Sequence, residues 1–358
     1  MKSFNIGNYE IKLPIIQGGM GVGVSLNGLA AAVANEGGVG VISCAGLGLL
    51  YKESPADYIK NSIYGLKEEL RKVREKTKGV IGVNIMVALS NFNDMVRTAI
   101  NEKADIIFAG AGLPFDLPSF LTEGSKTKLA PIVSSARAAK LICEKWLNNY
   151  NYLPDAIVVE GPKAGGHLGF KKEQIEDENH SLEHLIPEVV SVAAQYNEQK
   201  NIPVIAAGGI ATGEDILRFL QLGATGVQMG SIFVPTDECD ASPAFKQAFV
   251  DATETDNIII QSPVGLPGRA FNGEFIHHVN EGKTKPKGCP YHCIKTCDYT
   301  KSPYCIIRAL YNAAKGNMDK GYVFAGANAY LTEKISSVKE VISNLKLEFI
   351  NAKLKLQV

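Results

Sequence analysis

A β-branched run gives way to glycines and a histidine in the stretch Val158-Val159-Glu160-Gly161-Pro162-Lys163-Ala164-Gly165-Gly166-His167-Leu168-Gly169. The paired valines favour a buried strand. The glycines adopt backbone angles that are closed to other residues, and they let a ligand approach the main chain. A histidine placed there can exchange a proton near neutral pH. By itself the stretch fits a tight loop with a carbonyl-bonded imidazole equally well, so the rest of the chain must decide its role.

Seven other short apolar runs share this pattern of a strand followed by a helix-like segment. They are Leu13–Gln17, Val39–Ser43, Val80–Met86, Asp105–Ala109, Ala130–Ser134, Pro203–Gly209 and Gly226–Ser231. The runs are continuous rather than alternating, which is typical of parallel strands buried on both faces. Eight strand–helix units in about 250 residues predict a TIM (β/α)8 barrel over residues 1–255. A doubly wound sheet is the alternative, although no dinucleotide-binding fingerprint is complete.

The connecting segments carry helix start and stop signals. Leu26, Leu29, Ala30 and Val33 share one helical face ahead of Gly37-Gly38. Thr212 to Asp215 has the form of a capping box, and Ser242-Pro243 predicts another helix start. The segment with Pro114 and Pro118 has the weakest helix signals of these connecting segments.

Beyond about residue 255 the strand–helix pattern breaks. We expect residues 256–358 to form an appended C-terminal region over the barrel mouth. Its helices are expected around Cys305 to Ala314 and around Ile335 to Leu347.

Composition limits the classes of function. The 358-residue chain has 37 Lys and Arg against 37 Asp and Glu, so bulk charge does not favour binding to nucleic acid or to an anionic membrane. We find no signal peptide pattern and no apolar run of transmembrane length, and we expect a cytoplasmic protein with reduced thiols. A small-molecule substrate is expected, and a homodimer is left open.

The ends of the predicted strands are rich in groups that suit a phosphorylated ligand. Gly208-Gly209 and Gln228-Met229-Gly230-Ser231 follow the seventh and eighth strands, where barrels of this type most often bind phosphate. Gln17-Gly18-Gly19-Met20, Asn84 and Glu160 end other strands. A planar heterocycle with a phosphate tail would use these groups well. Flavin mononucleotide (FMN) fits, and a sugar phosphate also fits.

These elements together resemble the nitronate monooxygenase family, which also holds flavin-type enoyl-ACP reductases and some quinone reductases. The matching motifs are Pro14 to Met20, Gly82 to Asn84, Glu160 to Gly169, and Pro203 to Gly209 with Gln228 to Ser231. The resemblance implies a barrel that binds FMN without a covalent link. It implies flavin contacts from Asn84, Glu160, Gly165, Gly166, Gly208, Gly209 and Gln228 to Ser231, with Gln17 to Met20 along one side. His167 matches the family's active-site histidine.

Two positions depart from the family's patterns. Residue 160 is often glutamine in the monooxygenases and residue 163 is often acidic in the reductases, whereas this chain has Glu160 and Lys163. We expect oxidation of alkyl nitronates with O2 to a carbonyl compound and nitrite. The alternative is an NAD(P)H-dependent enoyl-ACP or quinone reductase using the same FMN. A non-catalytic sensor of a phosphorylated ligand is the hypothesis from another class.

Four cysteines cluster late in the chain, namely Cys289, Cys293, Cys297 and Cys305. Their spacing matches no standard zinc or iron–sulfur motif, and three of them would share one face if the segment were helical. A metal or cluster site, reduced structural thiols and a redox disulfide all stay open.

Overall fold

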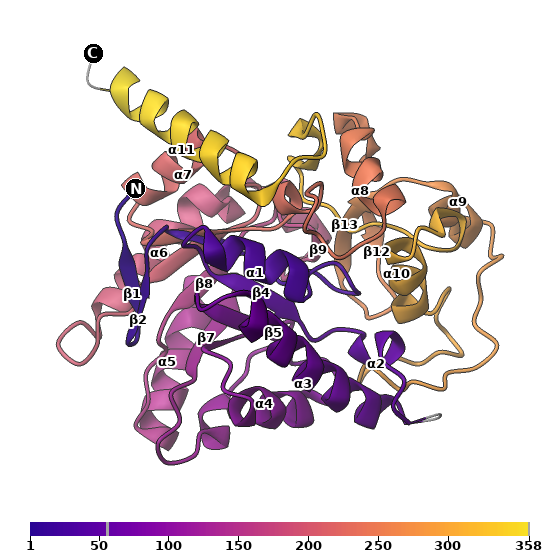
Figure 1. The fold of residues 1–358 in the computed structure, drawn as a ribbon, viewed down its shortest axis with the longest axis horizontal. Helices are drawn as coiled ribbons and strands as arrows, with labels where there is room; N and C mark the ends of the chain where they lie inside the picture. The colour runs from indigo at the N-terminus through magenta and orange to yellow at the C-terminus, as the bar shows by residue number, and fades with distance from the viewer. Residues whose placement is uncertain (55–56, 357–358) are drawn as a thin grey trace.

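The computed structural model describes residues 1–54 and 57–356, and its main feature is a sheet of eight parallel strands (Figure 1). The strands follow one another in the order β3-β11-β10-β8-β7-β6-β5-β4. A parallel bridge between Ile16 and Val39 joins the two ends of this sheet, and the Gln17 amide donates to the Val39 carbonyl over 2.9 Å. The sheet therefore closes into the predicted TIM barrel, and the doubly wound alternative is wrong.

Each predicted apolar run forms one barrel strand. The strands are β3 (Ile15–Gln17), β4 (Gly40–Ser43), β5 (Ile81–Met86), β6 (Ile106–Gly110), β7 (Lys128–Val133), β8 (Ile157–Glu160), β10 (Val204–Ala207) and β11 (Gly226–Met229). The helices between them are α1 (Asn27–Asn35), α2 (Leu47–Leu50), α3 (Tyr58–Lys76), α4 (Phe92–Asn101), α5 (Ala136–Tyr150), α6 (Leu182–Ala194) and α7 (Gly213–Gln221). Only a short 3-10 turn, Leu117–Phe120, follows β6, where the prolines predicted the weakest helix.

Local signals set the helix boundaries as predicted. Thr212 and Asp215 form a reciprocal capping box at the start of α7. Ser242 caps α8 (Pro243–Val250), where Pro243 occupies the first turn. Gly37 has a φ of +90° just after α1, so only a glycine ends that helix without strain. These signals fix where the helices begin and end, and therefore where the connecting loops lie.

The barrel interior is a packed core. Phe108 is fully buried there, and Gly82 on the neighbouring strand makes room for its ring, since a Cβ on Gly82 would lie 2.6 Å from the Phe108 ring. An N-terminal hairpin, β1 (Phe4–Ile6) with β2 (Tyr9–Ile11), buries Ile6 and Ile11 in the same cluster. Because this packing fills the interior, a ligand can bind only at the mouth of the barrel.

The C-terminal region is built onto that mouth. The antiparallel pair β12 (Asn257–Gln261) and β13 (Pro267–Phe271) forms a three-stranded sheet with β9 (Gly166–His167). The opening glycine-rich stretch therefore becomes the edge that the C-terminal region pairs with, as Figure 1 shows.

Three helices complete this region. They are α9 (Glu274–Asn280), α10 (Ile306–Ala314) and α11 (Val338–Lys355). The last helix begins three residues later and ends eight residues later than predicted, because the Ser337–Glu340 capping box sets its start. Within the described ranges, no helix is long and apolar enough to cross a membrane.

Candidate active site

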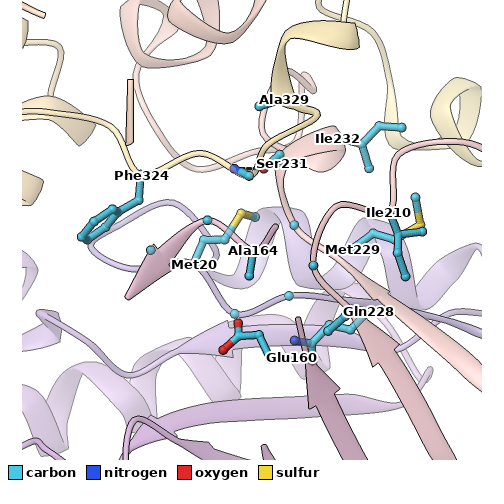
Figure 2. Close-up of a pocket in the computed structure, with 18 of the residues that line it drawn as sticks. Met20, Glu160, Ala164, Ile210, Gln228, Met229, Ser231, Ile232, Phe324 and Ala329 are labelled. Atoms are coloured by element: carbon cyan, nitrogen blue, oxygen red, sulfur yellow. Dashed lines mark hydrogen bonds between the residues drawn. The ribbon is translucent and has the colours of Figure 1, made fainter. Parts of the chain in front are cut away.

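A cavity of about 910 Å³ opens at the carboxyl ends of the barrel strands. Its walls include His167 and all but one of the predicted cofactor-binding residues: Gly18, Gly19, Met20, Asn84, Glu160, Gly165, Gly166, Gly208, Gly209, Gln228, Met229, Gly230 and Ser231. Figure 2 shows Glu160 and Gln228 at the strand ends, with Ser231 and Ala329 on the far side of the opening. The volume is large for a small substrate and suits a cofactor together with a substrate.

The loops after β10 and β11 form the cradle that was predicted to hold phosphate. Gly208 and Gly209 have φ values of +99° and +78°, which favour glycine at both positions. Among the described residues, the backbone amides of Gly209, Ile210 and Gly230 donate to no acceptor. The Ser231 hydroxyl accepts from the Gly326 amide over 2.9 Å, which leaves its own proton available. Free amides and a free hydroxyl are the donors that a phosphate ester needs.

Elsewhere in the cavity wall, two glycines pack closely against neighbouring residues. A Cβ added to Gly19 would lie 2.3 Å from Asn84 Cβ, so the loop after β3 lies directly on Asn84. Gly165 is packed in the same manner, because a Cβ there would lie 2.6 Å from the backbone of Ala325 and Gly326. A side chain at either position would clash, so the two glycines allow these loops to pack closely beside the cavity.

Gln17 is the one predicted cofactor-binding residue outside the cavity lining. It is fully buried beneath the loop, where its Oε1 accepts from the Val41 amide over 3.0 Å and its Nε2 donates to Ser25 Oγ over 2.8 Å. Gln17 Nε2 also donates to the Gly18 carbonyl. Its side chain therefore shapes the loop from Gly18 to Ser25 and does not reach the ligand space.

His167 lies on β9, the strand that connects the barrel to the C-terminal region. Its Nε2 lies 2.7 Å from Ser262 Oγ, and its ring packs edge-on against Phe324 with ring centroids 5.0 Å apart. Burial lowers the pKa of His167 to about 4. The imidazole is therefore neutral at physiological pH. Nδ1 makes no hydrogen bond to any residue that the structure describes and is free for a ligand.

Glu160 contributes the second titratable group of the cavity. Burial raises the pKa of its carboxyl to about 7. Because a charged carboxylate is unfavourable at this strand end, the protonated acid is populated near neutral pH and can donate a hydrogen bond. A carboxylic acid with that property can donate a hydrogen bond as an amide does.

Lys163 is placed differently from what its charge suggested. Its side chain is exposed outside the cavity, and its carbonyl accepts from the Ala327 amide over 3.0 Å. A Cβ on Gly209 would contact the Lys163 side chain at 2.7 Å, so this residue covers the outside of the β10 loop. The Lys163 ammonium therefore has no direct contact with the reacting space.

Three residues of the site come from the C-terminal half and were not predicted from the sequence. Ser262 and Phe324 hold His167, and Asn328 Nδ2 donates to the Gly209 carbonyl over 2.6 Å while lining the cavity. Ser262 stood in a turn-rich stretch without a motif. The stretch Tyr322 to Gly326, which contains Phe324 and precedes Asn328 by two residues, also resembles the family loosely and was the one available signal.

The fold and the site together define a TIM barrel with a large cavity at its mouth that offers free backbone amides, a free hydroxyl and two titratable side chains. The family model described as nitronate monooxygenase matches residues 2–348, and the chain belongs to that family. This membership excludes the sensor hypothesis: the chain is an oxidoreductase of nitronate monooxygenase type, a flavin-dependent class.

Individual relatives agree with this placement. The chain is 27% identical over 354 residues to a probable nitronate monooxygenase of Staphylococcus saprophyticus, covering 92% of this chain and 93% of that one. It is 28% identical over 308 residues to a probable nitronate monooxygenase of Staphylococcus aureus strain Newman, covering 76% and 79%.

Solved structures show the same fold. FabK from Thermotoga maritima superposes with a TM-score of 0.73 at 28% identity, covering 97% of this chain and 96% of that one. A nitroalkane oxidase from Streptomyces ansochromogenes superposes with a TM-score of 0.73 at 21% identity, covering 97% and 98%. The second likeness supports the fold alone.

Proposed function

We propose that the chain is an FMN-dependent nitronate monooxygenase that oxidises alkyl nitronates with O2 to a carbonyl compound and nitrite. The observation that carries this proposal is the position of a neutral His167, with one ring nitrogen held by Ser262 and the other free, above a slot lined by glycines. The curated relatives named probable nitronate monooxygenase support the reaction class.

The cavity fits FMN by the chemistry of its donors. The free amides of Gly209, Ile210 and Gly230, with the Ser231 hydroxyl, would hold the phosphate. Asn84, Glu160 and Gln228 would hydrogen-bond the polar edges of the ring system. When bound, the flavin supplies the one- and two-electron chemistry and the reaction with O2, while the protein supplies position and electrostatics.

His167 would act on the substrate directly. A neutral imidazole with a free Nδ1 can accept a proton from a nitroalkane carbon or hydrogen-bond a nitronate oxygen. Phe324, Leu266 and Leu310 also line the cavity and provide apolar surface for an alkyl chain. This arrangement exposes the polar head of a nitronate to His167 and keeps its tail out of water.

A reductase that uses NAD(P)H and passes hydride to an enoyl thioester or a quinone is the second candidate. Two observations favour it. Identity to FabK is 28%, and residue 160 is a glutamate where the resemblance to the monooxygenases implies a glutamine. In that reaction His167 would polarise the substrate carbonyl through the same free nitrogen.

One comparison separates the two reactions. Under anaerobic conditions, the bound flavin is mixed with an alkyl nitronate and, separately, with NADH or NADPH, and its absorbance is followed over time. Rapid reduction by the nitronate and slow reduction by either nicotinamide are expected. The reverse result would replace the monooxygenase with the reductase, and a purified protein without flavin would reject both.

A further inference from the structure

A second cavity, of about 260 Å³, is lined by four cysteines. They are Cys289, Cys293, Cys297 and Cys305. The segment that carries the first three is irregular, so the helical face considered from their spacing does not form. In this irregular conformation, the three cysteines line one cavity together with Cys305.

This segment is anchored to the barrel by backbone hydrogen bonds. Ile294 forms an antiparallel bridge with Leu89, in the loop after β5. The Lys295 amide donates to the Ala88 carbonyl over 3.0 Å, and the Ser90 amide donates to the Cys293 carbonyl over 3.1 Å. The cysteine cavity is therefore a built part of the fold.

The four thiols face one another. Cys293 is only 6% exposed, and all four cysteines line the same cavity. Four thiols that share one half-buried cavity are placed to ligate cations that lie between them.

The arrangement argues against a single metal ion. A zinc ion binds thiolates at about 2.3 Å, which brings the four sulfurs to within roughly 3.8 Å of one another. Among the residues that the structure describes, no three Cys, His, Asp or Glu side chains converge in that manner. A cluster of several iron ions and sulfides instead occupies a volume and spreads its four thiolate ligands around it.

We propose that Cys289, Cys293, Cys297 and Cys305 hold an iron–sulfur cluster. The cavity between the four thiols supplies the space that such a cluster needs. All seven cysteines are free, so no disulfide competes for these ligands in this conformation.

The surroundings supply the groups that stabilise thiolate sulfur. Cys305 is the N-cap residue of α10, so its sulfur lies at the positive end of the helix dipole. Ser302 Oγ lies 3.7 Å from Cys297 Sγ, and Lys295 lines the cavity. Hydrogen bonds and cations near the sulfurs offset the negative charge of a cluster with four thiolates.

The cysteine cavity lies close to the flavin cavity. Tyr304 lines the cysteine cavity, and its ring centroid lies 5.6 Å from that of Tyr322. The Tyr322 ring lies 5.0 Å from Phe324, which lines the flavin cavity beside His167. The proposal rests on the four thiols alone, and the flavin provides an independent measure of correct folding.

The test measures the metal itself. The full-length protein is purified anaerobically and analysed for iron, acid-labile sulfide and zinc, and a dithionite-reduced sample is examined by EPR. Iron and sulfide in equal amounts, at about two to four of each per chain, are expected with a reduced-cluster EPR signal. The half-buried Cys289→Ala and Cys297→Ala variants should each lose most of the iron, while Cys143→Ala and Cys239→Ala, which alter buried thiols elsewhere, should keep it.

Flavin content distinguishes loss of the cluster from loss of the fold. The two ligand variants should retain bound flavin at the wild-type level. If the wild-type protein contains no iron even after anaerobic incubation with ferrous ion and sulfide, or contains zinc alone, the proposal is overturned. Equal iron content in the ligand and control variants would overturn it as well.

Discussion

Ser262 fixes the ring of His167 through a 2.7 Å contact between Oγ and Nε2, although the two residues are 95 positions apart in the chain. Antiparallel pairing of β13 with β9 makes this contact, because Gly268 lies opposite His167 and the turn before β13 carries Ser262. The catalytic candidate of the barrel is thus oriented by the C-terminal region. Ser262 is a positioning residue, since it acts through His167.

Removal of this contact should reduce turnover without loss of flavin. In Ser262→Ala the ring of His167 loses one of its two restraints, and we expect kcat to fall by about tenfold. KM should change little, because the substrate wall stays intact. Ser262→Thr, which keeps the hydroxyl, should recover most of the rate. If both variants showed a lower kcat together with a higher KM, Ser262 would have a structural role only.

Removal of the imidazole should have a larger effect. His167→Ala should lower kcat/KM by about 10²–10⁴-fold, as expected for a general base or a directed hydrogen-bond donor. Flavin content, measured by absorbance after purification, should stay near the wild-type level because the phosphate cradle is untouched. A His167→Ala protein with bound flavin and full turnover would contradict the role assigned to this residue.

Two adjacent glycines provide a matched test of the close packing beside the proposed flavin site. A Cβ on Gly19 would lie 2.3 Å from Asn84 Cβ, whereas the nearest atom to a Cβ on Gly18 lies at 3.5 Å, in ordinary contact. Gly19→Ala should therefore cost about 1–3 kcal/mol of unfolding free energy and reduce flavin occupancy. Gly18→Ala should change the unfolding free energy little. Thermal unfolding and flavin absorbance measure the difference, and equal behaviour of the two variants would refute the packing argument.

Gln17 should matter for stability more than for direct flavin contact. Gln17→Met keeps a similar volume but leaves the Val41 amide without its buried acceptor, so we expect a loss of about 1–3 kcal/mol in unfolding free energy. Gln261→Met, on the exposed end of β12, is the control and should have little effect. Urea unfolding of the two variants provides the comparison. A Gln17→Met protein as stable as the control would contradict the anchoring role.

The barrel was predictable because its signals are local. Continuous runs such as Val204–Ala207, caps such as Thr212 and end glycines such as Gly37 each depend on a few neighbouring residues. The glycine loops were predictable as well, because their position after the seventh and eighth strands follows from the strand count. All the site residues predicted from the barrel except Gln17 line one cavity.

The contributions of the C-terminal half depend on pairing across long separations. Ser262 reaches His167 only through the β13–β9 register, and Asn328 reaches Gly209 over 119 positions. No spacing rule in the sequence links such residues. The same reason applies to Gln17, whose side chain is held beneath the loop because its Oε1 accepts from the Val41 amide while its Nε2 donates to Ser25.

Opposite pKa shifts at Glu160 and His167 predict a specific pattern of stability with pH in the flavin-free protein. The folded pKa of His167, about 4, lies below the unfolded value of 6.5, so the unfolded chain binds more protons between these values. The unfolding free energy contributed by His167 therefore rises with pH from about 4 to 6.5. The folded pKa of Glu160, about 7, lies above 4.5, so its contribution falls as pH rises from 4.5 to about 7.

The two contributions oppose each other between pH 4.5 and 6.5, and single variants should reveal them. Glu160→Gln removes the contribution that falls with pH and keeps the contribution of His167 that rises. The unfolding free energy of this variant, relative to wild type, should therefore rise across this interval. For His167→Gln, the unfolding free energy relative to wild type should fall. Because both side chains face an open cavity, we expect about 1–2 kcal/mol over the interval for each. Urea unfolding of the flavin-free proteins at several pH values measures the slopes, and parallel curves for the two variants would show that the cavity does not shift these groups in opposite directions.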